Sequence, residues 1–225
     1  MRTTFAVTGA TLAAAAAITL SACGSSSSTR SSSTMPGGHS MSGMSISSMP
    51  TASGTARAGA PASGPHNTAD VTFATDMIPH HAQALAMAKM ALTKAASPKV
   101  KQLAQRIEHE QSPEITLMSG WLKGWNKPVP DTTMGGMDMG SHSGSMTMPG
   151  MMSAADMAKL NSATGSTFDK LFLSQMITHH TGAITMANAE LTHGQNSDAK
   201  TLATSIITGQ SKEITEMKTL LLTTN

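Results

Sequence analysis

The stretch Met77-Ile78-Pro79-His80-His81 returns 99 residues later as Met176-Ile177-Thr178-His179-His180. Identities continue on both sides of it at the same offset and without a gap, across residues 68–118 and 167–217. A register kept over that length, through two helical patterns and the turn between them, indicates an internal duplication. The chain is therefore expected to contain two copies of one structural unit.

Each copy has the apolar spacing of two long helices joined by a turn. In the first copy the line through Phe73, Met77, Ala84 and Ala88 follows the 3.6-residue period. Helix-capping residues and Gly or Pro at the turns set the expected ends. We expect helices from residue 68 or 70 to about 93, from 97–98 to about 125, from 167 to 193, and from 196 or 197 to about 222, with a short helix over 153–161.

Two helical hairpins of this kind predict an all-α fold, a four-helix bundle built from the duplicated hairpins. Small residues on the inward faces would let the helices approach closely; they are Ala84, Ala88, Ala183 and Ala187. Pro79 is expected to kink the first helix, and Pro113 to kink or divide the second, because proline lacks the backbone N–H and its ring crowds the preceding turn.

The N-terminus has the pattern of an export signal. Arg2 precedes an apolar run over residues 10–20 that is too short for a good permanent membrane span. The run ends in Leu20-Ser21-Ala22-Cys23, which resembles a bacterial lipobox; the resemblance implies cleavage after residue 22 and lipid attachment at Cys23. We expect an extracytoplasmic lipoprotein held on the membrane, at the cell surface or in the periplasm. The alternative is a plain signal peptide over residues 1–22 followed by an incidental cysteine.

Two low-complexity segments accompany the predicted bundle. Residues 23–67 are rich in Ser, Gly and Thr and have little to bury, so we expect a disordered tether before a folded region over 68–225. A Met/His-rich loop at 126–156 interrupts that region. Its thioethers have no evident packing role and can surround a soft ion, which makes them candidate secondary metal ligands, although low-complexity drift is the alternative. The candidates are Met134, Met137, Met139, His142, Met146, Met148, Met151 and Met152.

Composition excludes some functions and favours soft-metal chemistry. Only 12% of the residues are charged, the formal net charge is +2, and no Lys/Arg cluster suggests a nucleic-acid partner. Twenty residues are Met, whereas Cys23 is the single cysteine. A protein in an oxidising compartment, where thiols tend to form disulfides, can use methionine as its soft ligand.

The duplicated histidine pairs are the candidate metal ligands of the bundle. Each pair follows one Met by about a turn and precedes another by about two turns. Imidazole with thioether sulfur suits Cu(I), and imidazole with a carboxylate suits Cu(II). The two segments could form two similar sites or share one. The alternative is that the histidines are structural and hydrogen-bonded in the core, because a buried ring N–H needs a partner.

A four-helix bundle can also hold a di-iron centre, which needs a Glu-x-x-His motif on each of two helices. Glu190-Leu191-Thr192-His193 has this form, but the first copy has Ala91 and Lys94 at the matching positions. His193 next to Gly194 is more simply a residue at a helix C-terminus, where the dipole favours it. A metal oxidase is therefore the less favoured hypothesis.

The two segments at residues 76–88 and 168–187 resemble the signature segments of the bacterial "domain of unknown function 305" (DUF305) family, which is similar to ferritin-like bundles and includes CopM-type periplasmic copper-binding proteins. This resemblance covers residues 68–222. It implies an exported helical protein that binds copper or silver and contributes to metal tolerance. The Met/His ligand pattern that it implies falls on Met77, His80, His81, Met87, Met176, His179, His180 and Met186.

We therefore expect an anchored copper sponge or chaperone, without a catalytic residue, that takes up Cu(I), Cu(II) or silver and could pass the ion to an unidentified acceptor protein. The alternatives are a ferritin-like metal oxidase and a surface interaction module with structural histidines. Because ligation needs neutral imidazole, the sequence also predicts that binding through the helices weakens below about pH 6.

Overall fold

The computed structural model describes residues 62, 64–132 and 148–224. These residues form five α-helices with no strand among them: α1 (Thr68–Lys94), α2 (Pro98–Gly124), α3 (Ala154–Ser162), α4 (Gly165–His193) and α5 (Ser197–Thr223).

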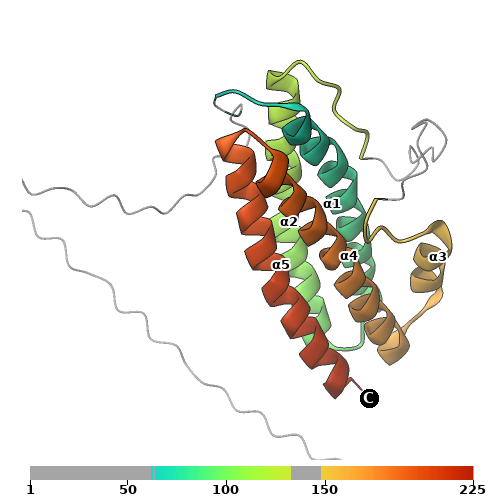
Figure 1. Cartoon of the computed structure of the whole chain (residues 1–225). Helices are drawn as coiled ribbons and strands as arrows, with labels where there is room; N and C mark the ends of the chain where they lie inside the picture. The colour runs from blue at the N-terminus through green and yellow to red at the C-terminus, as the bar shows by residue number, and fades with distance from the viewer. Residues whose placement is uncertain (1–61, 63, 133–147, 225) are drawn as a thin grey trace, which may run out of the picture. The chain divides into compact units, whose positions relative to one another are not determined.

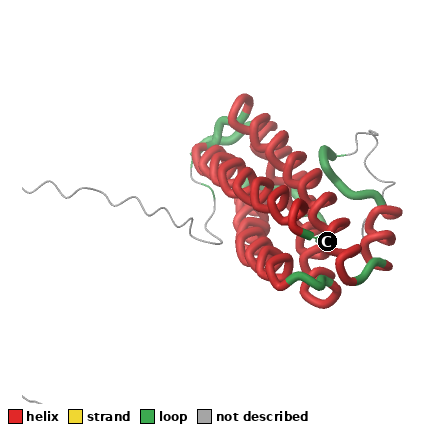
Figure 2. The backbone as a smooth tube through the Cα atoms, turned by 90° about the horizontal axis from the view of Figure 1, so that it is seen from below, coloured by secondary structure: helices red, strands yellow, loops and turns green. Residues whose placement is uncertain are grey.

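The four long helices form a bundle of two hairpins, α1–α2 and α4–α5 (Figure 1). The hairpins meet along α1 and α4, whereas α2 and α5 touch at few points. The short helix α3 stands to one side of the bundle in both views (Figure 1, Figure 2) and contacts α1 and α4. The all-α bundle of duplicated hairpins predicted from the sequence is confirmed.

Local sequence accounts for the helix ends. Asn67 caps α1, since its side chain accepts from the Asp70 N–H and the Asp70 carboxylate accepts from the Asn67 N–H in return. Ser153 and Asp156 form a capping box at the start of α3. Helix α4 begins at Gly165, two residues earlier than predicted, because Gly165 adopts a positive φ of 62° that a glycine tolerates. The prediction that Pro113 could divide its helix is wrong, since α2 is continuous through it.

Two apolar clusters fill the bundle, one towards each end. The first is built around Met87, Leu103, Phe172 and Met176, and the second around Met77, Met118, Trp121 and Ala203. The predicted small inward residues are fully buried, namely Ala84, Ala88, Ala183 and Ala187. Between the two clusters lies a layer of buried polar side chains, which we call the polar layer: His80, His81, Gln111, His179, His180, Gln210 and Glu213.

Two aspartates, one from each copy, join the duplicated hairpins by reciprocal hydrogen bonds. The Asp169 carboxylate accepts from the backbone N–H groups of Ala96 and Ser97 in the α1–α2 turn. The equivalent Asp70 accepts from Gln195 and Asn196 in the α4–α5 turn. Each copy thus supplies the carboxylate that satisfies the free helix-start donors of the other, which fixes the axial register of the hairpins and the level of the polar layer.

The last residues before α1 also lie against the bundle. The His66 ring stacks on Trp125 at 4.6 Å between ring centroids, and the Pro65 carbonyl accepts from the Asn196 side chain. Ordered contacts therefore begin before residue 68, the start predicted for the folded region. Among the helices of the described residues, none has the length and apolar character needed to span a membrane.

Candidate metal centre

Four histidines occupy the middle of the polar layer. His80 and His81 come from α1, and His179 and His180 from the equivalent level of α4, where the two helices pack together. All four are at most 1% exposed. The His80 and His179 rings face each other across the junction of the two copies, with 3.8 Å between their centroids. The structure therefore brings the two predicted His-His segments together.

Two glutamates hold the outer histidine of each pair. His81 Nε2 lies 2.7 Å from a Glu114 oxygen on α2, and His180 Nε2 lies 2.7 Å from a Glu213 oxygen on α5. An ionised carboxylate only accepts hydrogen bonds, so each Nε2 carries the proton and each Nδ1 keeps a free lone pair. This is the carboxylate–histidine arrangement that orients metal-binding imidazoles in proteins.

The inner histidines differ from each other. His80 Nε2 lies 3.1 Å from the Pro149 carbonyl oxygen, which can only accept, so this nitrogen is again the protonated one. His179 has no hydrogen-bond partner at either ring nitrogen.

The free nitrogens are the most informative feature of the layer. Five buried imidazole nitrogens have no hydrogen-bond partner among the described residues: Nδ1 of His80, His81 and His180, and both nitrogens of His179. Buried polar atoms are nearly always paired, and each unpaired one costs about 1–3 kcal/mol. The alternative that these histidines are structural therefore fits poorly. In three of the rings only one nitrogen has a hydrogen-bond partner, and in His179 neither nitrogen has one.

Burial keeps the inner imidazoles neutral. Desolvation, followed by the nearby His81, lowers the pKa of His80 to about 3, and the Pro149 carbonyl only partly opposes this. The pKa of His179 lies well below 6.5 for the same reason, with His80, His180 and His81 adding to the effect and a weak interaction with the His80 backbone, too poorly aligned to be a hydrogen bond, opposing it. Neutral imidazole is the form that binds a metal ion, so neither ring needs to lose a proton first.

The predicted methionine ligands lie on both sides of the histidines. Met77 and Met186 belong to the second apolar cluster, and Met87 and Met176 to the first. Because α1 and α4 run in opposite directions, the Met before one pair shares a cluster with the Met after the other. Among the described residues, no three His, Cys, Asp or Glu side chains converge as a metal site. The four histidines are therefore close together in the structure but are not arranged as a complete set of metal ligands.

The predicted secondary ligands are only partly described. Met134, Met137, Met139, His142 and Met146 lie outside the described residues, as does Cys23. Met148, Met151 and Met152 are partly buried, and Met152 packs against the first apolar cluster. The prediction that these methionines have no packing role is therefore wrong for Met152.

The Glu190-x-x-His193 motif does not join the histidine layer. Glu190 is buried near the end of α4 beside Asp70, and burial followed by the interaction with Asp70 raises its pKa to about 8. His193 is exposed and is the last residue of α4, as predicted. No second Glu-x-x-His lies opposite this pair in the described bundle, so the geometry offers no di-iron centre.

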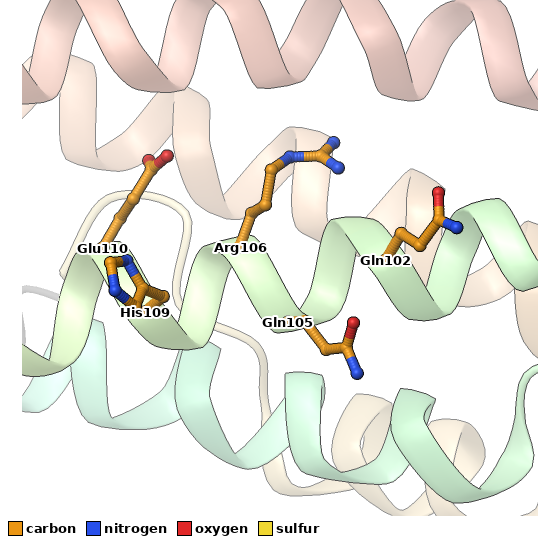
Figure 3. A pocket seen from close by; sticks show the side chains of 5 residues that line it. All are labelled: Gln102, Gln105, Arg106, His109 and Glu110. Carbon is orange, nitrogen blue, oxygen red and sulfur yellow. The ribbon is translucent and has the colours of Figure 1, made fainter. Parts of the chain in front are cut away.

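An open groove of about 650 Å³ runs between α2 and α5, on the side of the bundle where these helices barely touch. Glu114 lines it, with a side chain that is 20% exposed, so the carboxylate that holds buried His81 also meets solvent. Next to the groove, a pocket of about 600 Å³ lies over α2, and Arg106 and Glu110 extend from it towards α5 (Figure 3). Burial, followed by Glu213 and Glu114, raises the pKa of Glu110. Three carboxylates thus lie near one another here, and the basic side chains of Arg106 and Lys212 line the same side of the bundle.

The partners of the histidines were not among the residues predicted from the sequence. Glu114 and Glu213 are the only acidic pair that the duplication retains downstream of the histidines, and they lie 33 residues after His81 and His180 respectively. That equal offset was the feature of the sequence that could have identified these glutamates as partners of the histidines. Pro149 offered no signal, because it stands in a low-complexity segment without a counterpart in the other copy.

These features define a class of protein: a duplicated four-helix bundle with a buried histidine layer whose outer rings are held by carboxylates. Residues 70–221 match the family described as "Domain of unknown function (DUF305)". The chain belongs to this family.

Solved structures of the family resemble the bundle. A DUF305 protein from Streptomyces coelicolor, assigned as secreted, is 32% identical with a TM-score of 0.60, covering 68% of this chain and 92% of its own. CopM in its Cu(II)-bound form is 36% identical with a TM-score of 0.57, covering 68% and 96%. A DUF305 fragment from Deinococcus radiodurans is 28% identical with a TM-score of 0.60, covering 70% and 98%. No protein of curated function matches the chain.

Proposed function

We propose that the protein binds copper in the core of its bundle, through the four histidines and the methionines beside them. The observation that carries this proposal is the set of five buried imidazole nitrogens without partners. A fold that keeps such atoms in its core gives up stability, and a bound ion would satisfy them. The proposed ligands are Met77, His80, His81, Met87, Met176, His179, His180 and Met186.

Ligand chemistry favours copper and silver over harder ions. Thioethers and imidazoles select soft ions such as Cu(I), and imidazole with carboxylate suits Cu(II). Relatives support this choice, since CopM has been solved with Cu(II), with Cu(I) and with silver. Sequestration or delivery of the ion is the function that this arrangement serves best.

An extracytoplasmic location fits this chemistry. The N-terminal export pattern and the similarity to a DUF305 protein assigned as secreted support it. We propose that lipid attachment at Cys23 holds the protein on the membrane, where it would lower the free concentration of copper outside the cytoplasm. The Met/His residues at 134–152 would then act as secondary ligands that take up ions more weakly.

Competitive titration tests where the primary site lies. Residues 24–225 would be titrated anaerobically with Cu(I) against a colorimetric chelator, beside a variant lacking residues 133–147, which leaves the contacts of residues 148–152 in place. We expect tight binding to survive this deletion with only the weaker equivalents lost, because the histidine layer is unchanged. Loss of all tight binding with the deleted segment would contradict a primary site in the bundle.

A further inference from the structure

Residues 148–152, which we call the strap, cross the histidine layer on the α1–α4 side of the bundle. Pro149 places its carbonyl on His80 Nε2 at 3.1 Å. Three residues on, the Gln83 side chain bonds the backbone of Met152 twice, donating to its carbonyl at 2.9 Å and accepting from its N–H at 2.7 Å. The strap is therefore fixed to the helices by directed bonds to its own backbone.

The strap also needs a position without a side chain on α4. Gly182 is buried, and a Cβ atom at this position would lie 2.0 Å from the Pro149 oxygen and 2.7 Å from Gly150 Cα. Gly150 has a φ of +78°, and a Cβ there would meet the backbone of α4 at 2.7 Å. Only glycine at both positions permits this approach, since the atoms in the way belong to backbone that cannot rotate aside.

The residues that contact the strap differ between the two copies of the duplication. Gly182 occupies the position equivalent to Gln83, at the same offset of 99 residues that relates the histidines. In the first copy, the Gln83 side chain binds the strap. In the second copy, Gly182 has no side chain and so leaves room for it. The outcome is unequal histidines: His80 has a carbonyl on Nε2, whereas its equivalent His179 has both nitrogens free.

We propose that the strap is a positioning element that holds the Nε2 proton of His80, so that His80 offers Nδ1 alone to an ion while His179 can offer either nitrogen. The inference deepens the proposed function and rests on it for the identity of the ion. Outer groups that fix the tautomer of a ligating histidine typically change metal affinity by about 10–100-fold. Here that group is a main-chain carbonyl, and it distinguishes two sites that the duplication would otherwise make alike.

The test is Gly182→Ala in residues 24–225, with ring ¹⁵N spectra of the histidines recorded on the metal-free protein. In the wild type, His80 should show the Nε2–H tautomer alone. In the variant the added methyl group displaces Pro149, so His80 should show both tautomers, and Cu(I) affinity should fall about tenfold or more. Gly209→Ala is the matched control, since a Cβ in that helix lies no closer than 3.8 Å to its nearest neighbour.

Gln83→Leu releases the strap at Met152 instead and should have the same two effects, which keeps the test valid if Gly182→Ala fails to fold. An unchanged His80 tautomer in the folded variants would overturn the proposal, and so would a released tautomer with unchanged affinity. Absence of Cu(I) binding by the wild type would contradict the proposed function. The tautomer measurement tests the role of the strap in either case, because it needs no metal.

Discussion

Replacing His179 by leucine should make the protein more stable and a much poorer copper binder. Both ring nitrogens of His179 are buried without partners, so an apolar side chain of similar size removes an unfavourable term of about 1–3 kcal/mol from the folded state. The same change removes one ligand. Structural zinc sites with four ligands bind with roughly 10–16 kcal/mol, and on that scale one ligand contributes about 3 kcal/mol, a factor of about 100 in affinity. Urea denaturation and Cu(I) competition measure the two effects.

Two control variants separate this result from a general effect of removing histidine. His180→Leu should also weaken Cu(I) binding, but it should lower stability, because it leaves the buried Glu213 carboxylate without its partner. His193→Gln changes an exposed residue at the end of α4 and should alter neither quantity. If His179→Leu instead lowers stability and leaves copper binding intact, the histidines are structural and the proposed site is wrong.

Acidification below pH 6.5 should destabilise the metal-free fold through His80 and His179. In the folded protein the pKa of His80 is about 3 and that of His179 lies well below 6.5, whereas both rings take up a proton near pH 6.5 when the chain unfolds. Each ring therefore costs up to about 1.4 kcal/mol of stability for every unit that the pH falls below 6.5. The loss continues until the folded-state pKa is reached.

Glu190 should act in the opposite direction. Its folded pKa of about 8 lies above the value of 4.5 in the unfolded chain, so the stability it contributes is complete below pH 4.5 and is lost as the pH rises through 8. Stability should therefore decline on both sides of an intermediate pH.

Urea denaturation between pH 5 and 9 checks both directions. His179→Leu should reduce the acid slope by about 1.4 kcal/mol per pH unit, and Glu190→Gln should remove the alkaline decline. An acid slope equal to that of the wild type in His179→Leu would contradict this account.

The same pKa values revise an expectation drawn from the sequence. The expectation that metal binding through the helices weakens below about pH 6 was based on the ordinary pKa of imidazole. Because burial keeps His80 neutral to about pH 3, proton competition at this ring does not begin at pH 6. Binding through His80 and His179 should instead persist until acid unfolds the bundle.

The duplication made much of the fold predictable. A repeated Met-x-x-His-His segment at one level of two equivalent helices placed the four histidines in one bundle, and the apolar period placed them on buried faces. The contacts that complete the centre depend on tertiary packing. Glu114 meets His81 only because α2 folds back beside α1 at a rotation that periodicity does not fix. Asp70 completes the capping box of α1 and also binds the turn of the opposite hairpin, which one chain segment cannot indicate.

The strap shows a different limit of sequence analysis. Its contacts come from backbone groups in a Gly- and Met-rich segment, where no side-chain pattern marks a fixed conformation. The exchange of Gln83 for Gly182 between the copies was visible in the sequence, but its meaning depends on a third segment that packs against both. Divergent positions inside an otherwise retained repeat are therefore useful signals of asymmetric contacts.

The central claim is that copper sits among the buried histidines, and X-ray absorption at the copper edge tests it most directly. The measurement would use residues 24–225 loaded anaerobically with one equivalent of Cu(I). Our account predicts imidazole scattering together with sulfur from the neighbouring methionines, and loss of imidazole scattering in a variant with all four histidines replaced. A first shell of sulfur alone in the wild type would contradict the account, because no imidazole would then bind the ion.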